Sequence, residues 1–116
     1  MTFKRGSIYL ANFNPAKGGE PGKVRPCLVI QTDALNDSAH RTTTVLPLTT
    51  RLLNDSFPMR VTIEARDKLQ QTSQIMVDQV RSIDRNRFTS DTLTILKNHE
   101  MALVEAGLKT LLELEN

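Results

Sequence analysis

The sequence has a single cysteine, no tryptophan and no long apolar run. The lone cysteine, Cys27, cannot form an intramolecular disulfide or a cysteine-rich zinc site, and its apolar neighbours are typical of a buried thiol. No window approaches the ~18–20 apolar residues of a membrane span, and the start MTFKRGSIYL lacks the apolar stretch of a signal peptide. We therefore expect a cytoplasmic protein without membrane contact.

Aromatic residues and excess charge are also scarce. The chain has four Phe and one Tyr, and its 15 Lys and Arg nearly balance 13 Asp and Glu. A net charge of +2 is too small to indicate a nucleic-acid ligand, so any such argument depends on where the basic residues lie. The 116 residues contain no repeat or linker and predict one domain, residues 1–116.

Most of the chain has strand patterns, and its last quarter has a helical one. Alternation and short β-branched runs predict a half-buried first strand, a second strand buried on both faces, and three more, at 7–13, 25–31, 42–49, 59–64 and 73–80. Pro47 predicts a bulge or an unpaired edge position, and residues 33–41 are typical of a polar loop. Helical spacing from Leu93 onward, with Ser90 or Asp91 as the cap, predicts a terminal helix. The order indicates a mainly β fold with a C-terminal helix, of the α+β class.

No pattern in the sequence indicates a catalytic metal or a cofactor. His40 and His99 are far apart, and the acidic residues form no DxD or HExxH motif. The glycines of the loop at 14–23 lack the GK[ST] ending and the following helix of a phosphate-binding loop. We therefore expect neither a metal site nor a cofactor.

A loop and the strand after it bring a carboxylate and two cations together in the sequence. Glu20, Lys23 and Arg25 fall within six positions. An arginine can hold two phosphate oxygens, and a nearby carboxylate can accept the proton of a 2′-hydroxyl. The residues alone still favour an ordinary surface ion pair on a solvated loop, because charges often flank strands.

For the threonines and arginines elsewhere in the sequence, phosphate binding again competes with a structural role. The threonines at 42–44 and 49–50 could bind phosphate, but threonine is also a common strand residue. Arg81, Arg85 and Arg87 either line a groove that binds a nucleic-acid backbone or solvate the connection to the terminal helix. The residues favour neither reading of the arginines.

Four segments of the sequence carry a specific set of motifs. The opening KRGSIYLANFNPAKGGEPGKVRPCLVIQTD has RG, an alternating strand, P..G.E.G..RP and an apolar strand, and it is followed by VLPLTTR, FPMRVTIE and SQIMVDQVRSIDRNRF, which end at about Phe88. In these motifs and their order the sequence resembles the MazF/PemK (Kid-like) toxin family of type II toxin-antitoxin systems. The resemblance implies a small, curved SH3-like barrel of the MazF/CcdB/Kid type with a terminal helix, and a homodimer. It also implies a MazE-like antitoxin that blocks the RNA groove.

The resemblance also implies an activity and its catalytic residues. The family cleaves single-stranded RNA at short motifs, without a metal, by attack of the 2′-hydroxyl to give a 2′,3′-cyclic phosphate and a 5′-hydroxyl. The arginine of the RP pair falls on Arg25, the first threonine of the TT pair on Thr49 and the loop glutamate on Glu20. A guanidinium with a pKa above ~12 is a poor base, so we expect Arg25 to stabilise charge or act as an acid, and Glu20 to be the base.

The remaining expectations concern RNA binding and the alternatives to catalysis. The residues expected to bind substrate are Lys17, Lys23, Thr50, Gln79, Arg81 and Arg87. One alternative is a CcdB-like toxin that binds a topoisomerase without catalysis, since a shared fold does not dictate function. Another is a small barrel that binds nucleic acid without cutting it, although few aromatic residues are present to stack on bases.

Overall fold

The computed structural model describes residues 3–15, 17–19 and 22–115. Its strands are β1 (Ser7–Asn12), β2 (Val24–Val29), β3 (Thr42–Thr49), β4 (Arg60–Ile63), β5 (Ser73–Met76), β6 (Arg81–Asp84) and β7 (Thr94–Ile95). The helices are α1 (Asp33–Asn36) and α2 (Asn98–Leu112), with short 3-10 turns η1 (Val77–Gln79) and η2 (Arg85–Arg87). The predicted mainly β fold with a C-terminal helix is confirmed.

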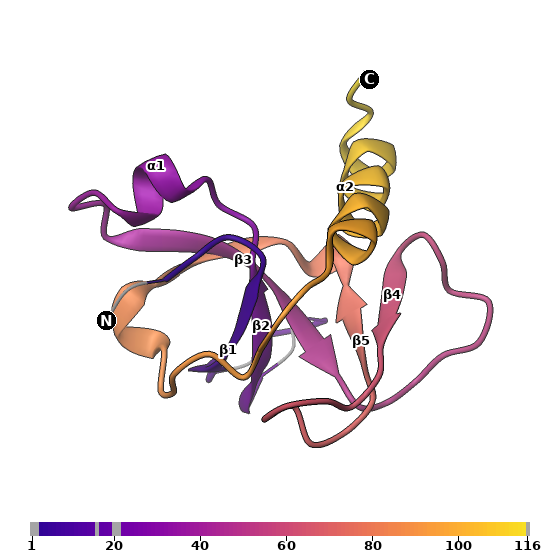
Figure 1. Cartoon of the computed structure of the whole chain (residues 1–116), viewed down its shortest axis with the longest axis horizontal. Coiled ribbons are helices and arrows are strands. Elements are labelled where there is room, and N and C mark those ends of the chain that lie inside the picture. The colour runs from indigo at the N-terminus through magenta and orange to yellow at the C-terminus, as the bar shows by residue number, and fades with distance from the viewer. Residues whose placement is uncertain (1–2, 16, 20–21, 116) are drawn as a thin grey trace.

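The strands form one curved, antiparallel sheet in which β3 has the central place. The order is β4-β5-β3-β2-β1-β7, and β6 pairs with the first half of β3. On this edge of β3, the ladder to β6 ends at Val45 and the ladder to β5 begins at Leu48. Pro47 falls in the gap, where no ladder N–H is needed, so it is unpaired on this edge, as predicted, although it faces Cys27 of β2 on the other. The change of partner curls the sheet into a half-barrel (Figure 1).

Both faces of the sheet are covered, and each carries its own apolar cluster. Ile8 of β1 belongs to the cluster that contacts α2, whereas Tyr9 and Ala11 belong to the second cluster. In that second cluster Phe3 stacks on Phe88, with ring centroids 4.1 Å apart. The prediction of a half-buried first strand was therefore wrong, because Phe3 and Phe88 cover the face that alternation left for solvent.

Three predicted boundaries were also wrong. The expected loop at 33–41 contains α1, which begins where the Thr32 hydroxyl accepts a hydrogen bond from the Ala34 amide. The expected strand at 73–80 ends at Met76, because η1 occupies residues 77–79 and separates β5 from β6. Neither Ser90 nor Asp91 caps a helix, because residues 93–96 instead pair with the edge of β1 through the hydrogen bonds Leu93 N to Ile8 O and Leu96 N to Gly6 O.

Helix α2 packs closely against β4 and η1. Gly107 lies at the contact, where an added Cβ would be 2.7 Å from the carbonyl oxygen of Pro58. A glycine inside a helix costs about 1 kcal/mol relative to alanine, and here it permits the close approach. Within the described ranges, neither helix has the length and apolar character needed to cross a membrane.

One buried ion pair ties α2 to the turn between β4 and β5. Both Arg66–Glu100 hydrogen bonds, Nη1 to Oε2 and Nη2 to Oε1, are 2.7 Å long. The same carboxylate accepts the Lys97 amide at the start of α2. These contacts, led by the Arg66 hydrogen bonds, lower the pKa of Glu100 from 4.5 to about 2. The ionised form of the Glu100 carboxylate therefore stabilises the folded state.

We predict that Glu100→Gln destabilises the protein at neutral pH and much less in acid. A folded-state pKa below the unfolded value contributes stability above the unfolded pKa, and this stability is lost as the pH falls from about 4.5 towards 2. The loss at pH 7 should be on the order of 2–3 kcal/mol, measured by urea unfolding at pH 7 and at pH 3.

The matched control is Glu105→Gln, which removes the partner of Arg5 in an exposed pair. Exposed pairs contribute less than about 1 kcal/mol, so this variant should unfold almost like the parent. Equal effects of the two substitutions at pH 7 would contradict the prediction.

Candidate functional site

An open cleft of about 470 Å³ lies where the start of β2 meets the end of β3. We call it the main cleft; it is lined by residues 23–26, residues 48–51 and Ser73. Two strand ends and the loops that continue them thus contribute nearly all of its wall. Rigid strands here carry side chains next to adaptable loops, which is a common arrangement for binding sites.

The register of β2 and β3 brings Arg25 and Thr49 to the same end of the sheet. The antiparallel ladder pairs Val29 with Val45 and ends with Cys27 opposite Pro47; Arg25 and Thr49 each follow two residues beyond this last pair, and both line the main cleft. Side chains two residues apart in a strand share a face. Both side chains therefore project from the same face at the mouth of the sheet, and both are half-buried.

The backbone around Arg25 holds its guanidinium in place. Nε donates a hydrogen bond to the carbonyl oxygen of Gly22 at 2.8 Å, and Nη1 donates to that of Leu48 at 3.3 Å. Burial lowers the pKa of Arg25 from its ordinary value, although a guanidinium remains a cation in proteins. Its other N–H groups are left to bind an anion in the cleft.

The Thr49 hydroxyl is oriented by its own loop. Its Oγ1 accepts a hydrogen bond from the Arg51 amide at 3.1 Å. A hydroxyl that accepts in this way can still donate its proton, and the described residues offer it no acceptor. Thr49 is thus prepared to donate a hydrogen bond to an incoming oxygen.

A buried glutamine, Gln74 of β5, fastens the loop that follows Thr49. Its Oε1 accepts the Leu53 amide and its Nε2 donates to the Leu53 carbonyl. Arg60 reinforces the loop by donating to both Gln74 Oε1 and the Arg51 carbonyl. The backbone that carries the exposed side chains of Thr50 and Arg51 is therefore held on the sheet.

The loop between β1 and β2 is closed at its base. Lys23 has a φ of 70°, its amide donates to Asn14 Oδ1 and its carbonyl accepts the Phe13 amide. Arg87 donates from Nη1 to the carbonyls of Asn12 and Asn14. These bonds bring Lys23 to the cleft wall. Glu20, the predicted base, lies outside the described residues.

The structure brings together four of the predicted site residues in the main cleft: Lys23, Arg25, Thr49 and Thr50. The other predicted site residues that the structure describes, Lys17, Gln79, Arg81 and Arg87, are not among its lining residues. Lys17 is exposed in the β1–β2 loop, Gln79 lies in η1, and Arg81 of β6 has its guanidinium carbon 5.5 Å from the centre of the Phe13 ring. Arg87 supports the loop base rather than the cleft wall.

Two cleft residues, Arg51 and Ser73, were missed by the sequence reasoning. Arg51 directly follows the threonine pair, so its position in VLPLTTR was the available signal. Ser73 comes from β5, more than twenty residues later, and nothing in its local sequence indicates a site. Its hydroxyl donates to the carbonyl of Gln71 at 2.9 Å.

Cations and hydroxyls dominate the main cleft. Lys23, Arg25 and Arg51 supply positive charge, and Thr49, Thr50 and Ser73 supply hydroxyls. No carboxylate is among the described residues of the wall, and the described part of the chain gathers no three His, Cys, Asp or Glu side chains around a metal position. A cluster of this kind suits a phosphodiester, whose charge needs N–H and O–H donors.

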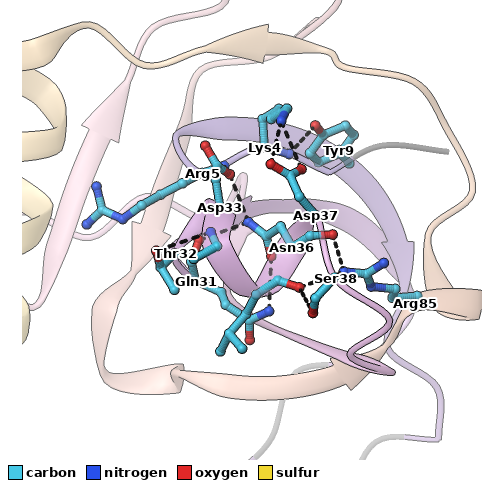
Figure 2. Close-up of polar contacts among 12 residues, drawn as sticks. Lys4, Arg5, Tyr9, Gln31, Thr32, Asp33, Asn36, Asp37, Ser38 and Arg85 are labelled. Carbon is cyan, nitrogen blue, oxygen red and sulfur yellow. Dashed lines mark hydrogen bonds and ion pairs between the residues drawn. The ribbon is translucent and has the colours of Figure 1, made fainter.

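Arg85 belongs to a separate polar network that holds α1 and the N-terminal segment (Figure 2). Its Nη2 donates to the carbonyls of Leu35 and Asn36 at the end of α1. At the start of the helix, Asp33 accepts the Arg5 amide at 2.8 Å. Arg85 therefore has a structural role, but it holds α1 rather than solvating the connection to the terminal helix.

Cys27 lies below the cleft with no exposed surface. Burial raises the pKa of its thiol to about 12, so the nucleophilic thiolate is suppressed at neutral pH. The predicted buried, structural thiol is confirmed.

We predict that iodoacetamide does not modify Cys27 in the folded protein at pH 8 and modifies it fully in 6 M guanidinium, because only unfolding exposes the sulfur and restores an ordinary pKa near 8.5. Intact mass spectrometry over a time course measures both rates. Comparable rates in the two conditions would contradict the burial.

The sequence and the fold are similar to known proteins. A family model described as PemK-like, MazF-like toxin of type II toxin-antitoxin system matches residues 4–112. Endoribonuclease EndoA of Bacillus subtilis is 36% identical over 115 residues, which cover 98% of this chain and 97% of that protein. A crystal structure of MazF from Deinococcus radiodurans matches with a TM-score of 0.80 and 28% identity, covering 97% of this chain and 98% of that one. A MazE-MazF structure from the same organism matches with a TM-score of 0.77 and 28% identity, covering 99% of each chain.

Proposed function

The chain belongs to the PemK-like, MazF-like toxin family of type II toxin-antitoxin systems, and from this premise we propose that its main cleft cleaves single-stranded RNA without a metal. The toxin is an endoribonuclease, as its relative EndoA is named. The observation that carries the proposal is the placement of Arg25 and Thr49 together in a cleft of cations and hydroxyls. These groups match the scissile phosphate of a phosphodiester.

The reaction begins with attack of the 2′-oxygen on the adjacent phosphorus. A bond forms between the 2′-oxygen and phosphorus, the bond from phosphorus to the 5′-oxygen breaks, and the products are a 2′,3′-cyclic phosphate and a 5′-hydroxyl. The 2′-hydroxyl loses a proton to a base, and the 5′-oxygen gains one from an acid. No water and no covalent enzyme intermediate take part in this step.

Arg25 and Thr49 stabilise the charge that develops on the phosphoryl oxygens. The guanidinium is held by two backbone carbonyls, so it need not reorganise during the reaction, which is the most effective form of electrostatic catalysis. The lowered pKa of Arg25 also favours it as the acid at the 5′-oxygen. Glu20, two residues before the carbonyl of Gly22 that orients Arg25, is the proposed base.

Substrate binding extends beyond the catalytic pair. Lys23 and Thr50 line the main cleft, and we assign them to the phosphates and sugars beside the scissile bond. Lys17, Gln79, Arg81 and Arg87 lie outside its wall, and we assign them to more distant nucleotides. The protein acts in the cytoplasm as a homodimer, and a MazE-like antitoxin opposes it, as in the MazE-MazF structure of Deinococcus radiodurans.

We predict that the purified protein cuts a long single-stranded RNA at few sites in excess EDTA. End mapping should find 5′-hydroxyls, and mass spectrometry should find cyclic phosphates. Intact RNA with folded protein would contradict the proposal and favour a toxin that binds a topoisomerase or a barrel that only binds nucleic acid. Neither alternative is favoured by the relatives, which include a named endoribonuclease.

We predict that Thr49→Val lowers kcat by about 10²-fold, because loss of one donor to the developing charge has this order of effect. Valine keeps the shape and strand preference of threonine. KM should change little, since the bond strengthens mainly in the transition state.

The control is Thr42→Val at the other end of β3, where the hydroxyl is outside the main cleft. It should cleave RNA at the parental rate. Parental activity in Thr49→Val, or an equal loss in both variants, would contradict the assigned role.

A further inference from the structure

A second depression of about 590 Å³ continues from the main cleft. The two share Pro26, Thr50 and Ser73, so a ligand bound in one reaches the other without leaving the surface. We call this second depression the side groove. It lies between β1 and the turn that joins β4 to β5, which none of the catalytic residues occupies.

The walls of the side groove differ in chemistry from those of the main cleft. Apolar side chains of Leu10, Leu69 and Leu93 line it together with Asp67, Lys68, Gln70 and Gln71. Both glutamines are exposed, and within the described ranges neither side-chain amide makes a hydrogen bond. The groove thus combines apolar surface with free amide donors and acceptors, whereas the main cleft combines cations with hydroxyls.

The turn that carries these side chains is rigidly held. Arg66 and Leu69 exchange two backbone hydrogen bonds, of 3.0 and 2.9 Å. The Asp67 carboxylate accepts the Thr94 hydroxyl at 2.6 Å, and the Lys68 amide donates to the Leu93 carbonyl at 3.0 Å. With the Arg66–Glu100 ion pair, these bonds join the turn to β7 and α2. The backbone beneath Gln70 and Gln71 is therefore preorganised, which reduces the entropy lost on binding.

We propose that the side groove binds one base of the RNA next to the scissile phosphate, and that Gln70 and Gln71 determine which base is accepted there. The inference rests on the proposed function of the main cleft. A base has an apolar face and an edge of hydrogen-bond donors and acceptors, and this groove offers a partner to each. Glutamine amides can pair with such an edge through two hydrogen bonds, and single-stranded RNA leaves its base edges free.

The continuity of the two depressions favours RNA over a protein ligand. A nucleotide whose phosphate contacts Arg25 and Thr49 can extend its neighbouring base past Pro26 and Thr50 into the side groove. Lys68 at the rim adds a cation for the backbone of the same strand. The phosphate then fixes the register of the strand, and the glutamines read the sequence.

The test compares Gln70→Ala, Gln71→Ala and Gln71→Met with the parent on a single-stranded RNA pool of random sequence. Methionine keeps the length and apolar contacts of glutamine but lacks the amide. Sequencing of the 5′-hydroxyl ends gives the base preference at each position around the cut, and cleavage of the parent's preferred oligonucleotide gives kcat/KM. The control is Asn86→Ala, which removes an exposed amide outside both depressions.

We expect the glutamine variants to relax the preference at one position beside the cut by roughly 10-fold, the size expected for one bidentate base contact. Preferences at the other positions, and the pattern of Asn86→Ala, should match the parent. An unchanged pattern, or an equal loss of rate on all sequences, would overturn the inference and leave the groove to a protein partner. Failure of the parent to cut the pool would instead overturn the proposed function.

Discussion

The antiparallel register between β2 and β3 is the constraint on which the rest of the site depends. Because Cys27 pairs with Pro47, the next residues on the same face are Arg25 and Thr49, and both line the main cleft at the end of the sheet. A shift of the register by one residue would turn one of the two away from the cleft. The buried neighbours of both strands oppose such a shift, since it would move apolar side chains between the two clusters. The same packing that stabilises the fold therefore sets the geometry of the proposed catalytic pair.

Buried polar contacts fix the conformations of the loops next to the sheet. Gln74 satisfies the backbone of Leu53 and thereby holds the loop that carries Thr50 and Arg51. The Arg66–Glu100 ion pair holds the turn that carries Gln70 and Gln71. A buried amide or ion pair adds modest net stability but is costly to break, so it fixes one loop conformation. In this molecule such contacts lie directly beside both depressions of the surface.

Much of the fold could be predicted from the sequence, and the failures have a common cause. The strand at 42–49 was predicted at its observed bounds, and the unpaired position of Pro47 was predicted with it, because both depend on local pattern. Residues 93–96 were assigned to a helix on their leucine spacing, yet they pair with the edge of β1. The backbone hydrogen bonds of Leu93 and Leu96 outweigh the local helical pattern, and their partners lie more than eighty residues away. The break of the expected strand at η1 also has a long-range cause, because β5 and β6 pair with different halves of β3.

The sequence by itself determined the order of the main strands, the terminal helix, the buried state of Cys27 and, through its resemblance to a known family, the likeness of Arg25 and Thr49 to a catalytic pair. These features depend on periodicity, composition and short motifs, all of which are local. Only the tertiary structure decided that Arg25 and Thr49 line one cleft, that Arg51 and Ser73 join them, that Arg85 holds α1, and that Gln70 and Gln71 line a second groove. Each of these depends on which segments become neighbours in space, because long-range pairing and burial set the surroundings of a side chain.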